Sequence, residues 1–174
     1  MLKVAGVSQL EFEKIKKHAE QLHVECDFIY EDDLKGSVRD LFIKQEKVGQ
    51  VLMDSAVLLF SQVSRDELVQ LVKLLQQDVE FDGAIGVVNE NNAQWTLHHL
   101  LQELEREHQF YALLDEIQWR MKELEGLELA NLSDDHKKEL MDAYLFLQNP
   151  VEETKAQYHL SKLNELIELL YKLK

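Results

Sequence analysis

The first half of this chain contains one sequence pattern twice, and this repeat constrains the fold more than any other feature. Residues 2–29 and 58–85 align without a gap at an offset of 56. The identical pairs in this alignment are Leu2/Leu58, Val7/Val63, Ser8/Ser64, Glu11/Glu67, Lys17/Lys73, Gln21/Gln77 and Ile29/Ile85. After three inserted residues the similarity resumes at Ser37 and Thr96. An internal repeat of this length predicts one structural unit folded twice.

Each repeat has the order strand, helix, strand, helix. Ser8 and Ser64 occupy the positions of helix N-caps, and Glu11 and Glu67 follow three residues later, which is the signature of a capping box. The expected strands are residues 2–5, 26–30, 56–60 and 83–88, and the second helices begin at Ser37 and Thr96. Strands that alternate with helices predict an α/β fold, in which duplicated β-α-β-α units form a small, mainly parallel sheet of about four strands.

The second half of the chain has a helical pattern throughout. Apolar residues recur at helical spacing over residues 96–125, and the first glycine after them is Gly126. This pattern predicts one long helix and leaves open whether it bends at residues 107–110. Such a helix is about 40 Å long at 1.5 Å per residue, which is more than a small sheet can cover.

Two shorter helices follow the long one. Ser133 is the expected N-cap of the first, and Asn149-Pro150 supplies an N-cap and a first-turn proline for the second. The first is expected to extend through Leu140, Tyr144 and Leu147. The last helix has a wide apolar stripe made of Leu160, Leu163, Leu166, Ile167, Leu169, Leu170, Tyr171 and Leu173. A stripe of this width favours either self-association or burial against the long helix.

These patterns divide the chain into two parts. The expected α/β domain is residues 1–107, with repeat halves at about 1–50 and 56–107. The expected three-helix antiparallel extension is residues 108–174, and the two parts share the long helix 96–125.

The charge of the chain restricts the class of partner. It contains 33 acidic and 19 basic residues, for a formal net charge of −14. Nucleic acid is not an expected partner, because proteins bind phosphate backbones through Lys and Arg. Anionic membranes are disfavoured for the same reason, and no apolar run is long enough to cross a bilayer. With no signal-peptide pattern at residue 1, a cytoplasmic location is expected.

The single cysteine is not an expected nucleophile. Cys26 has acidic neighbours, Glu25 and Asp27, which would raise the pKa of its thiol. We therefore expect a buried structural thiol near the second strand.

One segment of the chain resembles a known family. Residues 92–97 are Asn-Ala-Gln-Trp-Thr-Leu, and residues 100–108 are Leu-Leu-Gln-Glu-Leu-Glu-Arg-Glu-His. Together with Leu58-Leu59-Phe60, Val63-Ser64 and Glu67-Leu68, they resemble a small bacterial family defined only as a domain of unknown function. Its motif is N-x-x-W-T-L-x-x-L-L-x-E-L-x-x-E-H, and the similarity covers residues 56–108. The resemblance implies no activity, but it implies that Trp95 and His108 belong to a shared pattern.

Trp95 is the first candidate for a binding residue. It precedes the helix cap Thr96, so it is either a core residue that closes the turn or an aromatic anchor for a partner or ligand. The same turn contains Asn92, and His108 lies further along the helix. These four residues are the expected partner-binding or ligand-binding set.

No metal or cofactor site is expected. Glu31, Asp32 and Asp33 follow the second strand, where carboxylates at a strand end could hold Mg²⁺, so this trio is an alternative metal site. The corresponding residues of the second repeat, 89–92, are not a carboxylate cluster. Glu105 and His108 have the spacing of a helical ligand pair, but the other helices lack a matching pair. No phosphate-binding glycine motif occurs.

The sequence contains no activated catalytic group, and Ser8 and Ser64 are better explained as caps than as nucleophiles. We therefore expect a non-catalytic module that binds a protein partner or a second copy through the helical extension. The alternative is a small metal-binding or ligand-binding domain, or an enzyme. Its site would be the C-terminal strand edge near Glu31–Asp33 and Asn89–Trp95.

Overall fold

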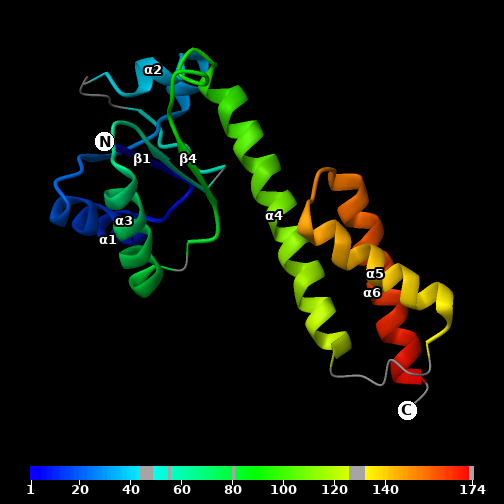
Figure 1. Ribbon diagram of the computed structural model, residues 1–174. Helices are drawn as coiled ribbons and strands as arrows, with labels where there is room; N and C mark the ends of the chain where they lie inside the picture. The colour runs from blue at the N-terminus through cyan, green and yellow to red at the C-terminus, as the bar shows by residue number, and fades with distance from the viewer. Residues whose placement is uncertain (44–48, 55, 80, 126–131, 173–174) are drawn as a thin grey trace. The chain divides into compact units, whose positions relative to one another are not determined.

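The computed structural model describes residues 1–43, 49–54, 56–79, 81–125 and 132–172. The chain has an α/β fold with a four-stranded mixed sheet, and it separates into two compact units, Met1–Glu107 and His108–Lys174 (Figure 1). The first unit contains the sheet and the helices that cover it. The second unit contains helices only.

The sheet consists of β1 (Leu2–Ala5), β2 (Cys26–Phe28), β3 (Val57–Phe60) and β4 (Ala84–Val87), in the order β2-β1-β3-β4. β1 is parallel to β2 and β3 is parallel to β4, which agrees with the expectation of a mostly parallel sheet. The central pair, β1 and β3, is antiparallel. Residues of β1 and β3 are buried on both sides, as the continuous apolar runs Leu58-Leu59-Phe60 and Val4-Ala5 predict.

The register of the central pair relates the two halves of the sheet. Lys3 lies opposite Leu59, its own counterpart at the offset of 56. On either side of this pair, Leu2 lies opposite Phe60 and Val4 lies opposite Leu58. The register is therefore self-complementary at this offset, because the counterparts of Leu2 and Phe60 are Leu58 and Val4, which also pair with each other.

The strand registers correct the position of the inserted residues. β1 pairs Leu2 with Cys26, whereas β3 pairs Leu58 with Ile85. The first spacing is 26 − 2 = 24 residues and the second is 85 − 58 = 27, so the three extra residues precede the second strand. Ile85 therefore corresponds to Cys26, and its alignment with Ile29 is wrong. Isoleucine is common in buried strands, so one identical pair does not define a register.

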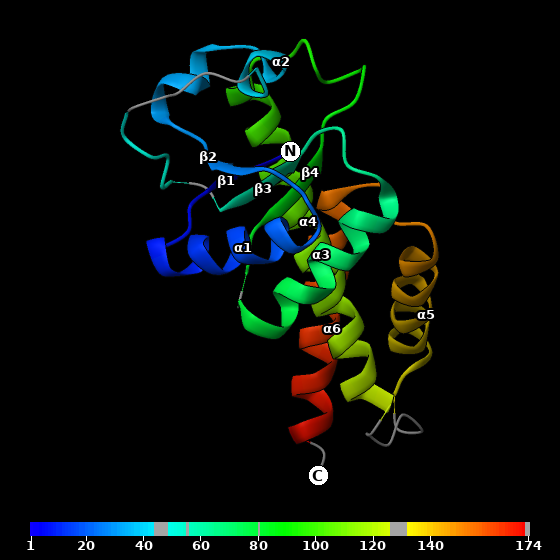
Figure 2. The ribbon, with the colours of Figure 1, turned by 90° about the vertical axis from the view of Figure 1, so that its left-hand side faces the viewer.

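One face of the sheet is covered by α1 (Gln9–Gln21) and α3 (Arg65–Asp78), which lie side by side (Figure 2). Both predicted capping boxes are confirmed. The Ser8 and Ser64 hydroxyls accept from the backbone N–H of Glu11 and Glu67, and each glutamate accepts from the serine N–H at 2.8 Å. The core on this face consists of Leu2, Val4, Val7, Phe12, Ile15, Ala19, Val24, Leu58, Phe60, Leu71, Leu75 and Val79.

The other face is covered by the 3₁₀ helix η1 (Glu31–Lys35), by α2 (Val38–Leu41) and by the first turns of α4 (Leu97–Glu125). Ser37 caps α2 as predicted, since its hydroxyl accepts from the Asp40 N–H at 3.2 Å. The core on this face consists of Ala5, Ile29, Val38, Leu41, Leu52, Val57, Leu59, Ala84, Leu97, Leu100, Leu101 and Leu104. α2 is thus one turn long, whereas α4, which aligns with it in the sequence, is the longest of the described helices.

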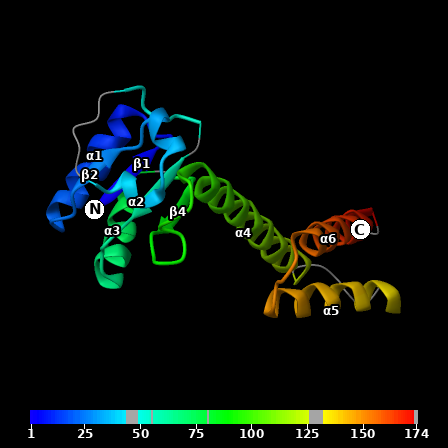
Figure 3. The same ribbon diagram turned by 90° about the horizontal axis from the view of Figure 1, so that it is seen from above.

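The second unit is formed by the rest of α4, α5 (Asp134–Gln148) and α6 (Glu153–Lys172) (Figure 3). α4 continues without a break through residues 107–110. Ser133 caps α5 as predicted, by accepting from the His136 N–H at 3.3 Å. The core consists of Leu114, Ile117, Leu124, Leu132, Ala143, Phe146, Ala156, Leu163, Leu166, Ile167 and Leu170. None of the described helices could span a membrane.

One expectation about this unit is wrong. Asn149-Pro150 does not begin the last helix, because Asn149 ends α5 and α6 begins at Glu153. On α5, Ala143 and Phe146 face the core, whereas Tyr144 is exposed. α5 has apolar residues on two sides, so helical spacing alone did not distinguish the buried side. Of the expected stripe on α6, Leu173 lies outside the described residues.

Candidate functional site

The two predicted strand-end loops do not share one edge of the sheet. β1 and β3 are antiparallel, so their parallel partners β2 and β4 also run in opposite directions. The loop after β2, with Glu31–Asp33, therefore leaves one edge, and the loop after β4, with Asn89–Trp95, leaves the opposite edge. A common C-terminal edge requires parallel neighbours, so the antiparallel centre separates the points at which the two loops leave the sheet. The alternative ligand site near Glu31–Asp33 and Asn89–Trp95 stays a prediction.

The same hydrogen bond organises both loops. The Tyr30 N–H donates to Asp33 Oδ2 at 2.9 Å, and the Asn89 N–H donates to Asn92 Oδ1 at 2.9 Å. Beyond the three inserted residues the two halves align at an offset of 59, and at this offset Asp33 aligns with Asn92. The Asn92 amide also donates to the Val87 carbonyl at 3.0 Å, at the outer edge of β4. Both side chains therefore have a structural role as loop caps.

The segments that follow these loops meet over the sheet. The Val38 N–H donates to the Trp95 carbonyl at 2.9 Å, and the Leu97 N–H donates to the Gly36 carbonyl at 3.0 Å. These two bonds flank the antiparallel bridge between Ser37 and Thr96, which align with each other in the sequence. Thr96 stabilises the start of α4, because its hydroxyl accepts from the His99 N–H at 3.3 Å.

Trp95 is a surface residue. The residue is 37% exposed, so of the two alternatives it is not a core residue, and its role as an anchor stays a prediction. The indole ring lies 4.7 Å from the His99 imidazole, with the rings tilted by 44°. Asn92, Trp95 and Thr96 come together in this turn. His108 is 12 residues beyond Thr96, about 18 Å along the helix, so the structure does not add it to the cluster.

The acidic trio does not form a metal centre. Glu31 and Asp32 are exposed, whereas Asp33 is buried and accepts from the Tyr30 N–H. Among the described residues, no group of three His, Cys, Asp or Glu side chains is arranged to hold a metal ion. The same holds for the glutamates and histidines of α4.

Cys26 is a half-buried thiol, whereas a buried one was expected. Burial raises the pKa of the Cys26 side chain to about 12, and the neighbouring Asp27 carboxylate adds to the increase. The thiolate is the nucleophilic form of cysteine. The prediction that Cys26 is not a nucleophile therefore agrees with its surroundings.

Lys3 is a buried cation that the sequence did not indicate. Its side chain is 6% exposed and its Nζ lies 2.7 Å from Asp27 Oδ2, on the neighbouring strand. Asp27 also accepts from the Phe28 N–H at 2.8 Å. The pair satisfies the buried ammonium within the sheet, so Lys3 has a structural role.

The second unit presents large apolar side chains to solvent. On α5, Met141, Tyr144 and Leu145 are 57%, 51% and 56% exposed. Their spacing of i, i+3 and i+4 places them on one side of the helix, away from Ala143 and Phe146. We call Met141, Tyr144 and Leu145 the α5 face. The signal for it was present in the sequence, because α5 has more apolar residues than one buried side requires.

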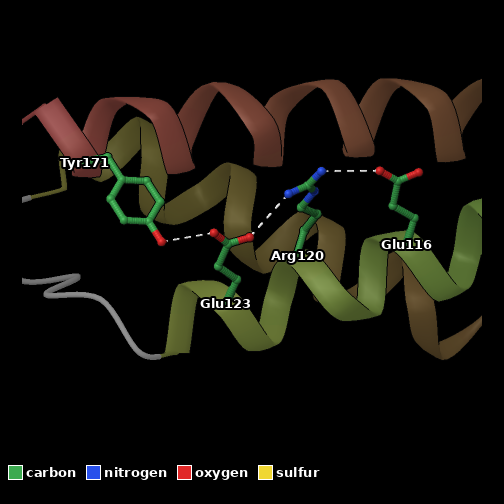
Figure 4. Close-up of polar contacts among 4 residues, drawn as sticks. All are labelled: Glu116, Arg120, Glu123 and Tyr171. Carbon is green, nitrogen blue, oxygen red and sulfur yellow. Dashed lines mark hydrogen bonds and ion pairs between the residues drawn. The ribbon is translucent and has the colours of Figure 1, made fainter.

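α4 presents an exposed aromatic residue of its own. Trp119 is exposed, and the Arg120 guanidinium lies 4.5 Å from its ring centroid. Figure 4 shows Arg120 between Glu116 and Glu123, with Arg120–carboxylate distances of 3.4 and 3.3 Å. The Tyr171 hydroxyl of α6 donates to Glu123 at 3.1 Å, which raises the pKa of that phenol. These contacts hold Arg120 beside Trp119 and connect the end of α6 to α4.

Comparison with known proteins identifies one family. Residues 56–111 match a family described as a domain of unknown function (DUF3783). The match covers β3, α3, β4 and the first half of α4, and it confirms the resemblance to an uncharacterised family at residues 56–108. Neither a curated protein nor a solved structure matches the chain.

Proposed function

We propose that this protein is a non-catalytic protein–protein interaction module and that its helical unit, His108–Lys174, supplies the binding surface. The α5 face is the observation that carries the proposal. A helix that buries one side usually has charged and polar residues on the opposite side. α5 instead has a methionine, a tyrosine and a leucine there, each more than half exposed.

Exposed apolar side chains at i, i+3 and i+4 are the pattern of a helix that docks against a partner helix or groove. Burial of these side chains removes apolar surface from water, which favours association. Trp119 with Arg120 supports the same proposal, because tryptophan, tyrosine and arginine are the residues that most often dominate binding energy. With a net charge of −14, the proposed partner is a protein rather than a nucleic acid.

We test this proposal by capture from native extract with the full chain as bait. The Met141→Lys, Leu145→Lys double variant places two charges in the α5 face without touching the core. Val69→Lys is the matched control, because Val69 is an exposed apolar helix residue of the first unit. Proteins retained by the wild type and by the control but lost by the double variant support the proposal. Equal capture by all three would contradict it.

We infer in addition that residues 1–107 are a duplicated β-α-β-α unit and that residues 108–174 are a helical extension of it. The matching capping boxes, the paired loop caps Asp33 and Asn92, and the Ser37–Thr96 bridge support the duplication. The proposed location is the cytoplasm, where a single unpaired thiol such as Cys26 stays reduced.

A further inference from the structure

We propose that Met141 is an oxidative modification site, and that conversion of its thioether to the sulfoxide releases a bound protein from the α5 face. This regulation rests on the proposed function, because it acts on the same surface. Met141 meets three conditions for such a site. It is exposed, it lies within the α5 face, and the other sulfur atoms of the chain lie elsewhere.

The chemistry at Met141 depends on access to solvent. The residue is 57% exposed, and a thioether has no acidic proton, so its oxidation does not require ionisation. The sulfur gives two electrons to hydrogen peroxide. The peroxide O–O bond breaks, one oxygen stays on the sulfur as the sulfoxide, and the other leaves as water. Methionine sulfoxide reductases reverse the step. In that reversal two thiols supply the electrons and form a disulfide, and the oxygen leaves as water.

The other sulfur atoms of the chain are less reactive or lie outside the α5 face. Peroxide oxidises cysteine through the thiolate, and burial raises the pKa of the Cys26 thiol to about 12. Met121 is half-buried against the core of the second unit, and Met1 is half-buried in the first unit. Met53 is 56% exposed, but it belongs to the first unit. Met141 is therefore the residue at which peroxide can change the proposed binding surface.

Oxidation reverses what Met141 contributes to binding. Met141 lies one helical turn from Tyr144 and Leu145. Its thioether is apolar and flexible, so it can pack against a partner of irregular shape. The sulfoxide is polar, and its oxygen accepts hydrogen bonds. An apolar partner that covers this oxygen would remove its water without replacing the hydrogen bonds, which disfavours association.

The same oxidation should leave the fold intact. The residues of α5 that face the core are Ala143 and Phe146, whereas Met141 is exposed. In the free protein, a sulfoxide at Met141 stays in water and keeps its hydrogen bonds to solvent. Oxidation of a methionine inside a core instead disrupts packing. The change at Met141 should therefore lower the affinity for a partner and not the stability of the helical unit.

Treatment of the full chain with dilute hydrogen peroxide tests the chemical step. Peptide mass spectrometry measures sulfoxide formation at each methionine over time. We expect Met141 and Met53 to react at similar rates, at least about fivefold faster than the half-buried Met121. A Met141 that reacts no faster than Met121 would overturn the inference. So would a loss of helical circular dichroism on treatment that Met141→Leu prevents, because it would show a structural role.

Capture from native extract tests the effect on binding, with the full chain as bait before and after treatment and with the peroxide removed first. We expect the treated wild type to bind about tenfold more weakly, the effect of losing the burial of one methionine side chain. Met141→Leu keeps an apolar side chain without the sulfur, so its binding should withstand treatment. Met53→Leu is the matched control and should lose binding as the wild type does. Met141→Gln, an uncharged polar substitute for the sulfoxide, should bind weakly without treatment.

The outcomes separate this inference from the proposed function. Mass spectrometry of the recovered bait establishes that Met141 is still oxidised during capture. Equal binding by the untreated and the fully oxidised wild type would overturn the inference and leave the proposed function standing. An equal loss of binding by treated Met141→Leu would overturn it too, because another residue would then be responsible. Untreated bait that retains no protein through the α5 face would overturn both.

Discussion

At the scale of single residues, most of the conspicuous side chains of the first unit have structural roles. Asp33 and Asn92 cap loops, Ser8 and Ser64 cap helices, and Thr96 supports the start of α4. Only the helix caps were assigned correctly from the sequence, because their signature is local. The loop caps depend on where the chain turns after each strand, which residue types alone do not define.

Cys26 gives the first prediction. Because burial raises its pKa to about 12, only about one thiol in ten thousand is ionised at pH 8. We expect a colorimetric disulfide reagent to react with the native protein several hundred-fold more slowly than with the unfolded chain. The rate should rise tenfold per pH unit in alkaline solution. Immediate stoichiometric reaction of the folded protein at pH 8 would show that the thiol is not buried.

The Lys3–Asp27 pair gives an asymmetric prediction. Asp27→Ala leaves a buried ammonium without its partner, so the first unit should lose about 3 kcal/mol of stability. Lys3→Met leaves a carboxylate that is 44% exposed and therefore solvated, so the change should be below about 1 kcal/mol. Urea denaturation of both variants checks this. Equal losses would mean that the lysine is not desolvated in the native state.

The two serine caps should contribute equally if the repeats are equivalent. Ser8→Ala and Ser64→Ala should each lower the free energy of unfolding of the first unit by about 1 kcal/mol. Unfolding is followed by tryptophan fluorescence. Because Trp95 lies in the first unit and Trp119 in the second, the variants are made in a Trp119→Phe background, in which the signal comes from the first unit alone. Ser8→Thr is the conservative control, since threonine retains the accepting oxygen. A loss at one serine only would contradict the equivalence.

At the scale of the elements, the beginning of β4 depends on a close backbone approach. A Cβ at Gly83 would lie 2.5 Å from the Ala56 carbonyl oxygen. The same Ala56 carbonyl accepts a hydrogen bond from the Ala84 N–H at 3.0 Å, at the start of the β3–β4 pairing. Side-chain ends can move aside, but a strand carbonyl cannot move without disturbing its ladder.

Gly83→Ala should therefore destabilise the first unit by about 2 kcal/mol or more. Gly36→Ala is the matched control. A Cβ there would approach only the Asp33 carbonyl, at an ordinary contact distance of 3.4 Å, so the change should stay within about 0.5 kcal/mol. Thermal unfolding of the two variants compares them directly. If Gly83→Ala is as stable as Gly36→Ala, the strand start is not closely packed.

α5 shows where sequence patterns lose information at this scale. Its N-cap, Ser133, and its approximate length were predicted. The side of α5 that is buried was not predicted, because apolar residues occur on two sides of the helix. One side has residues 140, 143 and 147, and the other has residues 141, 144 and 145. Helical periodicity ranks faces by hydrophobicity, and two comparable faces leave the choice to tertiary packing. The same ambiguity is what makes the α5 face a candidate for binding.

At the scale of the whole molecule, the repeat predicted the α/β class and the mostly parallel sheet. It did not predict the antiparallel join of β1 and β3, because local sequence specifies strands but not the direction in which distant strands meet. Because of that join, the two candidate loops leave opposite ends of the sheet, although they meet at the Ser37–Thr96 bridge.

The central claim is that the α5 face is a protein-binding surface. Hydrogen exchange of the full chain, followed by mass spectrometry with and without the proteins that it captures from native extract, tests it most directly. Association suppresses local opening where the partners meet. We predict that protection of residues 134–148 increases on binding, while that of residues 84–87 does not. Unchanged exchange in α5 on binding, or a change confined to β4, would contradict the claim.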